Sequence, residues 1–237
     1  MPLILAVDTS AKPISCALVR NGQVISSFYS NTGLTHSQTL MPMIESVLEI
    51  AGVTVNQLDA IAVNAGPGSF TGVRIGVSAV KGLAFTSDVP CVSVSTLECM
   101  AEHTAATAEC VICCVMDARC QQVYSALFEV NAVGERVRLW EDEAQSVDDL
   151  RKKLINIGKS VILVGDGSEM CYNALKDDIP DLFLAPPSVR YQNAAATAVI
   201  AERRLAQGQT VSSEDLLPVY LRLPQAEREL NNRLSQK

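Results

Sequence analysis

The sequence predicts an α/β protein of two similar lobes, each with a mixed sheet, that meet close to residue 108. The first observation is an order of elements in which three strands are followed by a helix, a strand and another helix. The second is that this order starts again at Cys110, where an apolar strand ends in Asp117 and enters a turn, as Leu3 to Ser10 does. Repetition of a whole supersecondary unit indicates a duplicated βββαβα arrangement.

The first half opens with Leu3 to Val7, a continuous apolar run that is typical of a strand buried on both faces. Asn21-Gly22 is a strong signal for a two-residue hairpin turn between the next two strands. Thr35 followed by Gln38 predicts a capping box at the start of an amphipathic helix. The strands predicted for this half are 3–7, 14–19, 24–29, 58–63 and 91–94, and the helices are 37–51, 72–86 and 95–106.

The second half follows the same order with shorter elements. Its predicted strands are 110–117, 123–130, 136–140 and 161–164, with a helix at 147–157, a Gly165-Asp166-Gly167 loop and further helices. The stretch that follows residue 225 is mostly polar. We therefore divide the chain into an N-terminal lobe (1–108), a shortened C-terminal lobe (109–225) and a polar C-terminal tail (226–237).

The composition favours an ordered globular protein and argues against one that grips nucleic acid by itself. Of the 237 residues, 48% are apolar and 19% are charged. The net charge is -7, from 19 Lys and Arg against 26 Asp and Glu, and the longest basic run is Arg151-Lys152-Lys153. Because a nucleic-acid-binding protein usually carries a basic face, we expect any role with RNA to depend on a more basic partner.

The start of the chain has the character of a strand and lacks the features of a targeting segment. Met1 to Val7 has no basic region ahead of its apolar run, and no apolar stretch approaches the roughly 18 residues of a membrane span. We therefore expect a cytoplasmic location.

Eight cysteines raise the question of a metal site. Cys110 and Cys113 have C-x2-C spacing, but no second pair follows at the distance of a zinc ribbon. Positions three apart on a strand also point to opposite faces, which makes one shared metal ion difficult. Buried, reduced thiols are the preferred interpretation.

Two loops of the first half are candidate phosphate or nucleotide loops. Asp8-Thr9-Ser10 follows the first strand, where an Asp could orient a metal-bound water while turn amides and hydroxyls face a phosphate. Gly66-Pro67-Gly68-Ser69 opens a helix, and a helix N-terminus attracts anions. The first loop is also ordinary turn chemistry, and the glycines of the second would let a strand and a helix pack closely. In the second half, Asp117-Ala118-Arg119 lacks the corresponding Gly and hydroxyl donors.

The two long helices of the first half carry an unusual amount of apolar surface. Between Gly72 and Thr86 the charged residues are Arg74 and Lys81, which lie on one narrow stripe. A helix that is apolar nearly all round must be covered on more than one side, either inside its own domain or by a partner protein. The candidate partner-binding residues on these helices are Leu40, Met41, Ile44, Val47, Leu48, Val73, Arg74, Val77, Val80 and Lys81.

Several motifs, taken in order, resemble the bacterial TsaB (YeaZ) family. The most specific is the eleven-residue run from Gly66 to Gly76, and the opening Leu5 to Ser10 is also similar. Further matches occur at Val94 to Leu97, at Asp117 to Arg119 and at Pro218 to Arg222, so that the resemblance covers nearly the whole chain.

This resemblance implies the two-lobed actin/hexokinase/Hsp70-type ATPase fold. It also implies a non-catalytic subunit in the synthesis of threonylcarbamoyladenosine next to the anticodon of tRNAs. In that family TsaB supports its larger relative TsaD, which carries out the transfer, and the small ATPase TsaE joins them. The resemblance implies a direct TsaB–TsaD heterodimer through the first-lobe helices, contact with tRNA only through the complex, and ATP or ADP at most weakly bound or shared.

The catalytic relatives carry a His-x3-His metal pair where this sequence has Thr96 and Met100. A hydroxyl and a thioether do not replace two imidazoles, so the resemblance implies no metal site. Three alternatives stay open. The chain could be an ATP-dependent small-molecule kinase that uses Asp8, a peptidase, or a homodimer that buries the helices when no partner is present.

Overall fold

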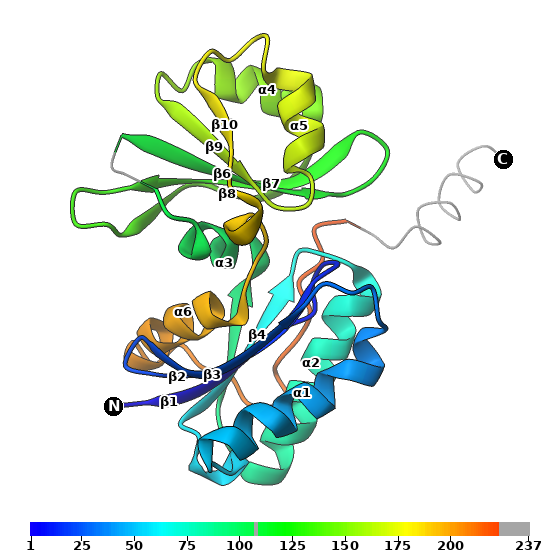
Figure 1. The fold of residues 1–237 in the computed structure, drawn as a ribbon, viewed down its shortest axis with the longest axis vertical. Coiled ribbons are helices and arrows are strands. Elements are labelled where there is room, and N and C mark those ends of the chain that lie inside the picture. Colours follow the sequence, from blue (N-terminus) through cyan, green and yellow to red (C-terminus); the bar gives the residue numbers. More distant parts are fainter. Residues whose placement is uncertain (107–108, 223–237) are drawn as a thin grey trace, which may run out of the picture.

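Two five-stranded mixed sheets form the molecule, one in each lobe, in the computed structural model, which describes residues 1–106 and 109–222 (Figure 1). The first sheet has the order β3-β2-β1-β4-β5 and the second has the order β10-β9-β6-β7-β8. The first-sheet strands are β1 (Leu3–Asp8), β2 (Ile14–Arg20), β3 (Gln23–Ser30), β4 (Ala60–Gly66) and β5 (Cys91–Ser95). The second-sheet strands are β6 (Cys110–Asp117), β7 (Gln122–Val130), β8 (Arg136–Ser146), β9 (Ser160–Val164) and β10 (Leu182–Leu184).

The two sheets have the same topology. The central strand of each, β1 or β6, pairs antiparallel with the next strand in the chain and parallel with the fourth. Both central strands are almost wholly buried, as their continuous apolar runs predict. The predicted duplication of a strand-rich unit is therefore confirmed.

The helices cover these sheets in layers. They are α1 (His36–Ala51), α2 (Phe70–Ser87), α3 (Thr96–His103), α4 (Val147–Ile155), α5 (Ser168–Leu175) and α6 (Ala194–Ala206), with short 3-10 turns at Val55–Gln57 and Pro187–Val189. Helices α1 and α2 pack on one face of the first sheet, and α4 and α5 pack on the second sheet. Helices α3 and α6 lie between the two sheets (Figure 1).

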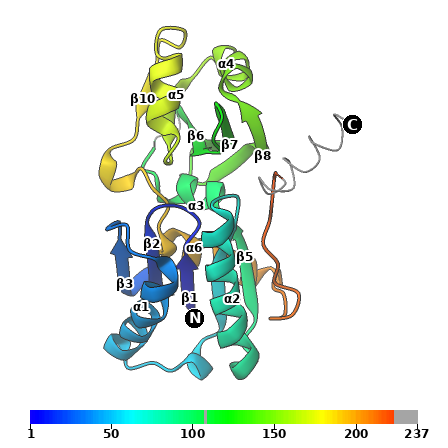
Figure 2. The ribbon, with the colours of Figure 1, turned by 90° about the vertical axis from the view of Figure 1, so that its right-hand side faces the viewer.

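The helix that ends each half of the chain packs on the sheet of the other half. Helix α3 contacts β6, β7 and β8 in addition to β4 and β5 of its own half, whereas α6 contacts the strands of the first sheet. Residues 211–222 then run beside β5 and α2 in the first lobe (Figure 2). All strands of the first sheet thus precede residue 108 and all strands of the second follow it, while α6 and residues 211–222 return to the first lobe. The polar tail predicted for residues 226–237 lies outside the described residues.

Local sequence signals agree with most of these elements, with three corrections. Asn21 and Gly22 have φ values of 52° and 70°, the left-handed pair that a two-residue hairpin needs. The capping box predicted at Thr35 is wrong, because its side chain caps nothing; the first turn of α1 is instead tied down by His36, whose Nε2 lies 2.8 Å from Ala11 O. Helix α3 ends before residue 106, and β8 continues past Trp140 because the long strand β7 offers it a partner as far as Ser146.

Apolar side chains from both faces of each sheet form the core. The clusters lie under α1 and α2, under α6, around α3 and under α4 and α5. Among the described residues, no helix has the length and apolar character needed to cross a membrane.

Candidate functional site

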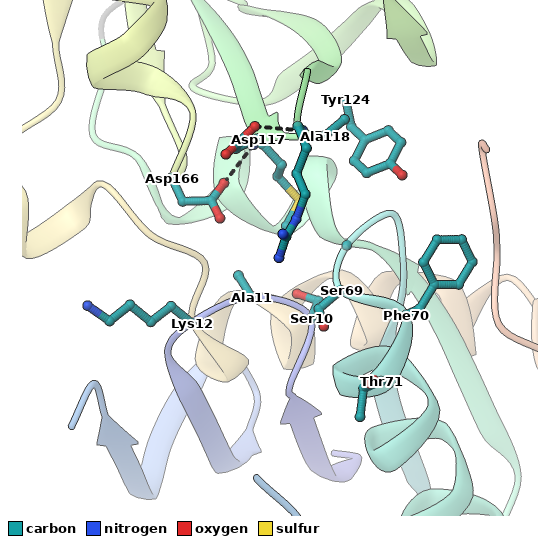
Figure 3. A pocket seen from close by; sticks show the side chains of 13 residues that line it. Ser10, Ala11, Lys12, Ser69, Phe70, Thr71, Asp117, Ala118, Tyr124 and Asp166 are labelled. Carbon is teal, nitrogen blue, oxygen red and sulfur yellow. Dashed lines mark hydrogen bonds between the residues drawn. The ribbon is translucent and has the colours of Figure 1, made fainter. Parts of the chain in front are cut away.

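A cavity of about 660 Å³ lies between the lobes and is lined by matching turns from each. The first lobe contributes the β1–β2 turn, including Ser10 and Lys12, and the β4–α2 turn around Ser69. The second lobe contributes the β6–β7 turn at residues 116–119 and Asp166 from the β9–α5 turn (Figure 3). Because the two sheets have the same topology, these four turns are related in pairs.

The first predicted phosphate loop reaches this cavity only through Ser10. Asp8 and Thr9 have no exposed surface and lie behind the cavity wall. Asp8 Oδ1 accepts hydrogen bonds from Ser10 N at 3.0 Å and from Ser10 Oγ at 2.6 Å, and Thr9 Oγ1 donates to Gly72 O at 2.7 Å. The functional groups of the loop are therefore used within the protein.

The surroundings of Asp8 favour its neutral form. Burial raises the pKa of this carboxyl above its ordinary value, although the hydrogen bonds from Ser10 lower it in part. Cys99 nearby is also fully buried, and burial raises the pKa of its thiol to about 12. The Cys99 thiol is paired with Thr197 on α6, which in turn donates to Asn64 Oδ1 at 3.0 Å.

The glycines of the second predicted phosphate loop allow close packing. A Cβ atom at Gly68 would lie 2.3 Å from Ser10 O, and one at Gly72 would lie 2.1 Å from Thr9 O. Ser69 N donates to Ser10 O at 2.7 Å, and the Ser69 hydroxyl caps α2 by accepting from Gly72 N at 3.3 Å. This geometry supports the packing interpretation of the loop.

Gly66 opens the same turn but does not line the cavity. Its φ of 125° suits glycine, and a Cβ there would lie 2.3 Å from Val219 O, so the C-terminal part of the chain covers it. Of the predicted loop residues, Ser10, Gly68 and Ser69 therefore reach the cavity, whereas Asp8, Thr9 and Gly66 do not.

Two carboxylates stand on the second-lobe wall of the cavity (Figure 3). Asp166 Oδ1 accepts a hydrogen bond from Asp117 N at 3.0 Å, and Asp117 Oδ1 accepts one from Arg119 N at 2.7 Å. Desolvation by burial raises the pKa of Asp166, and the nearby Asp117 carboxylate raises it further. Arg119 lines the same wall and Lys12 lines the first-lobe side, so the carboxylates of Asp117 and Asp166 share the cavity with two cationic side chains. The sequence shows both Asp residues, but only the fold brings them together.

The apolar candidates for partner binding lie in the first-lobe core, which corrects their interpretation as accessible surface. On α1 and α2 the buried candidates are Leu40, Ile44, Val47, Leu48, Val73, Val77 and Val80. Their side chains pack on the first sheet of this same chain. The remaining candidates are Met41, which is 37% exposed, and the charged pair Arg74 and Lys81.

A second cover of α2 is the C-terminal strap, residues 211–222, from this same chain. Lys81 Nζ donates to Glu214 O at 2.9 Å and to Leu216 O at 3.2 Å. Arg74 Nε donates to the Tyr220 hydroxyl at 2.7 Å. The charged stripe of α2 therefore holds a segment more than a hundred residues further along the chain, which periodicity cannot reveal.

An accessible strip remains along α2. Ser78 and Gly82 are exposed, and Phe85 at the end of the helix is 73% exposed. A Cβ added at Gly82 would meet nothing within 4 Å. No sequence signal marks this strip, because Ser78 and Gly82 are small and lie beside a larger number of apolar positions.

Comparisons with known proteins assign the family. A family model described as "TsaD: tRNA N6-adenosine threonylcarbamoyltransferase" matches residues 30–230. The tRNA threonylcarbamoyladenosine biosynthesis protein TsaB of Escherichia coli (strain K12) is 31% identical over 227 residues, which cover 92% of this chain and 94% of that protein. The protein of the same name from Bacillus subtilis (strain 168) is 30% identical, with 94% and 96% covered. The chain belongs to the TsaB family.

Solved structures agree with membership of the TsaB family. YeaZ from Pseudomonas aeruginosa superimposes with a TM-score of 0.77 at 29% identity, covering 93% of this chain and 100% of that one. Component A of the (R)-2-hydroxyglutaryl-CoA dehydratase of Acidaminococcus fermentans, at 12% identity, has a TM-score of 0.50, with 87% and 100% covered, and shows the fold alone. The predicted two-lobed α/β fold with a duplicated unit is confirmed.

In this TsaB-family chain, Thr96 and Met100 stand where the resemblance places the metal-binding histidines of the catalytic relatives, and both are part of the core. Thr96 has no exposed surface and Met100 is 1% exposed, packed in the cluster around α3. Among the residues that the structure describes, no three His, Cys, Asp or Glu side chains are grouped to hold a metal ion. Cys110 and Cys113 lie on the same strand, β6, and Cys113 is buried under α4 and α5.

Proposed function

We propose that the chain is a non-catalytic subunit that supports a TsaD-family transferase in tRNA threonylcarbamoyladenosine biosynthesis. Its relatives in the TsaB family carry the name of that pathway, and the TsaD family model covers most of its length. One observation supports the non-catalytic part of this proposal: the protein groups that were predicted to bind a phosphate are engaged in contacts within the chain. The Asp8 carboxyl is buried and held by Ser10, and the Gly-rich turn is filled by backbone.

The cavity between the lobes supports the same proposal. Its lining sets the Asp117 and Asp166 carboxylates against the cationic Lys12 and Arg119, so the positive charge that would attract a phosphate is offset within the cavity. We therefore propose that ATP or ADP is held elsewhere in the complex or shared with another subunit. We extend the proposal to TsaE as a further partner and to contact with tRNA through the complex.

The surface that we propose for the TsaD-family partner is the accessible part of α1 and α2. It consists of Met41 on α1 with Ser78, Gly82 and Phe85 on α2. Small side chains at Ser78 and Gly82 let another helix approach closely, and the neighbouring apolar groups provide area to bury. In the absence of the partner, the same surface could join two copies, which light scattering of the free chain would reveal.

A charged, bulky residue on this strip tests the proposal. We expect Ser78→Arg to abolish co-purification with the TsaD-family transferase and to remove the stimulation of tRNA modification, because Ser78 is exposed and central to the strip. Asn173→Arg is the matched control, since Asn173 is an exposed polar residue on α5 in the other lobe. Val77 and Val80 are unsuitable, because a charge at either buried position would disrupt the core.

Assays of ATP hydrolysis and tRNA modification, with and without the transferase, separate the proposal from the kinase alternative. The purified chain should neither hydrolyse ATP nor modify tRNA, while raising the modification rate when the transferase is added. Turnover of ATP by the chain alone that Asp8→Asn abolishes would favour the kinase. Unchanged co-purification of folded Ser78→Arg would move the partner surface away from α2.

A further inference from the structure

The C-terminal strap is anchored firmly in the first lobe. Leu216 is fully buried in the cluster under α1 and α2, and Val219 N donates to Ala65 O at 2.7 Å. The Tyr220 ring stacks on Phe70 with 4.8 Å between ring centroids, and the Arg74 guanidinium lies 5.5 Å from the Tyr220 centroid. Stacking and a cation over an aromatic face each add to the burial of the ring.

The far end of the strap crosses to the second lobe. Arg222 Nη1 donates to Ala118 O at 2.7 Å, and Leu221 packs against the cluster around α3. Ala118 belongs to the β6–β7 turn and lines the cavity between the lobes, as does Phe70 on the first-lobe side. The strap therefore bridges the two walls of the cavity beside Phe70.

The lobes are also joined through α3, independently of the strap. Glu98 on α3 forms ion pairs with Arg204 on α6 and with Arg138 on β8, the latter at 3.8 Å. Arg136 on β8 donates to the carbonyl groups of Ala101 and Thr104 at the end of α3. These contacts use several charged groups, whereas the strap crosses the gap with one guanidinium and one leucine.

We propose that the C-terminal strap is a clasp that sets the width of the cavity between the lobes, with Arg222 as the residue that closes it. Its first-lobe end is fixed by a buried leucine and an aromatic stack, so the crossing contact from Arg222 to Ala118 O is the weaker end. When that contact opens, the lobes stay joined at α3, which becomes the hinge.

The inference does not depend on the proposed function, because it concerns contacts inside one chain. It assigns a role to the Pro218–Arg222 motif, to which neither the proposed partner surface nor the Gly-rich turn gives one. It also links the exposed side of α2 to the cavity, since Arg74 holds the strap at one end and Arg222 holds the β6–β7 turn at the other.

Distances between spin labels on the two lobes test the clasp. Labels at Asn56 and Lys176, both exposed, report the lobe separation in a Cys120→Ser background, which removes the exposed native thiol. We expect one narrow distance distribution for the otherwise unchanged chain. Arg222→Ala should broaden this distribution toward longer distances and should speed amide exchange several-fold in residues 117–122.

Arg151→Ala is the matched control. Arg151 is paired with Asp148 and Asp178, and all three residues lie in the second lobe. This variant should keep the narrow distribution and the slow exchange. Circular dichroism of both variants checks that they are folded. If folded Arg222→Ala keeps the parent distribution and the parent exchange at residues 117–122, the strap is only a cover for α2 and the clasp is refuted.

Discussion

The carboxyl group of Asp8 lies at the end of β1 with no exposed surface, and the groups nearest to it are neutral. Ser10 donates both a backbone and a side-chain hydrogen bond to its Oδ1, while Oδ2 has no hydrogen-bond partner among the described residues. The thiol of Cys99 adds no charge, because burial raises its pKa to about 12 and keeps it in the neutral form. A buried acid without a counter-charge is more easily kept neutral than ionised.

This setting makes stability depend on pH in a defined direction. Since burial raises the pKa of Asp8 in the folded state, the folded protein holds a proton that the unfolded chain releases above its pKa near 3.8. The stabilisation is complete below that pH and is lost as the pH rises through the folded-state pKa. Asn is the uncharged isostere, so Asp8→Asn should remove this loss.

The measurement is the free energy of unfolding in urea over a series of pH values. As the pH rises above about 3.8, the free energy of unfolding of Asp8→Asn should increase relative to that of the original chain. A difference that is independent of pH, or one that shifts toward the original chain, would show that Asp8 is ionised in the folded state.

At the scale of a single element, α2 combines three kinds of residue that do different work. Its valines pack on the first sheet, Arg74 and Lys81 hold the C-terminal strap, and its glycines adjust spacing. Gly72 lies against the backbone of Thr9, whereas Gly82 faces open space. Two glycines of the same helix therefore have opposite sensitivities to a methyl group.

We expect Gly72→Ala to destabilise the protein by about 1–3 kcal/mol, because Thr9 O blocks the new Cβ. Gly82→Ala should stabilise it by about 0.5–1 kcal/mol, since alanine restricts the unfolded chain and meets nothing in the folded one. Urea unfolding of both variants gives the two values. Equal effects of the two substitutions would mean that the close packing at Gly72 does not contribute to stability.

For α2 as an element, sequence periodicity predicted the helix and its excess of apolar positions. It did not predict what covers them. The stripe of Arg74 and Lys81 looks like a solvent-facing edge in the sequence, yet Lys81 bonds to Glu214 O, 133 residues away. An extended strap has no periodic pattern of its own, so no local signal indicates that it will pack there.

At the scale of the whole molecule, ion pairs of Glu98 connect three elements, which come from both halves of the chain. Glu98 lies on α3 and pairs with Arg204 on α6 and Arg138 on β8. Its side chain is 24% exposed, so these pairs are partly shielded from water. By comparison, Glu169 pairs with Arg190 but is 70% exposed.

We therefore expect Glu98→Ala to lower the free energy of unfolding by about 1–3 kcal/mol, because two arginines lose a partly buried partner. Glu169→Ala should cost about 0–1 kcal/mol, as is usual for exposed pairs. Thermal and urea unfolding measure both. A loss for Glu98→Ala no larger than that for Glu169→Ala would show that the α3 junction is not held by this cluster.

The sequence alone determined the order of strands and helices, the duplication, the hairpin at Asn21-Gly22 and the resemblance to the TsaB family. These features are encoded locally, in hydrophobic period, in turn residues and in short motifs. Tertiary structure alone decided that α3 and α6 cover each other's sheets, that Asp8 is sealed behind Ser10, and that the strap covers α2. Each of these depends on contacts between residues far apart in the chain, whose energies are settled only when the two lobes pack together.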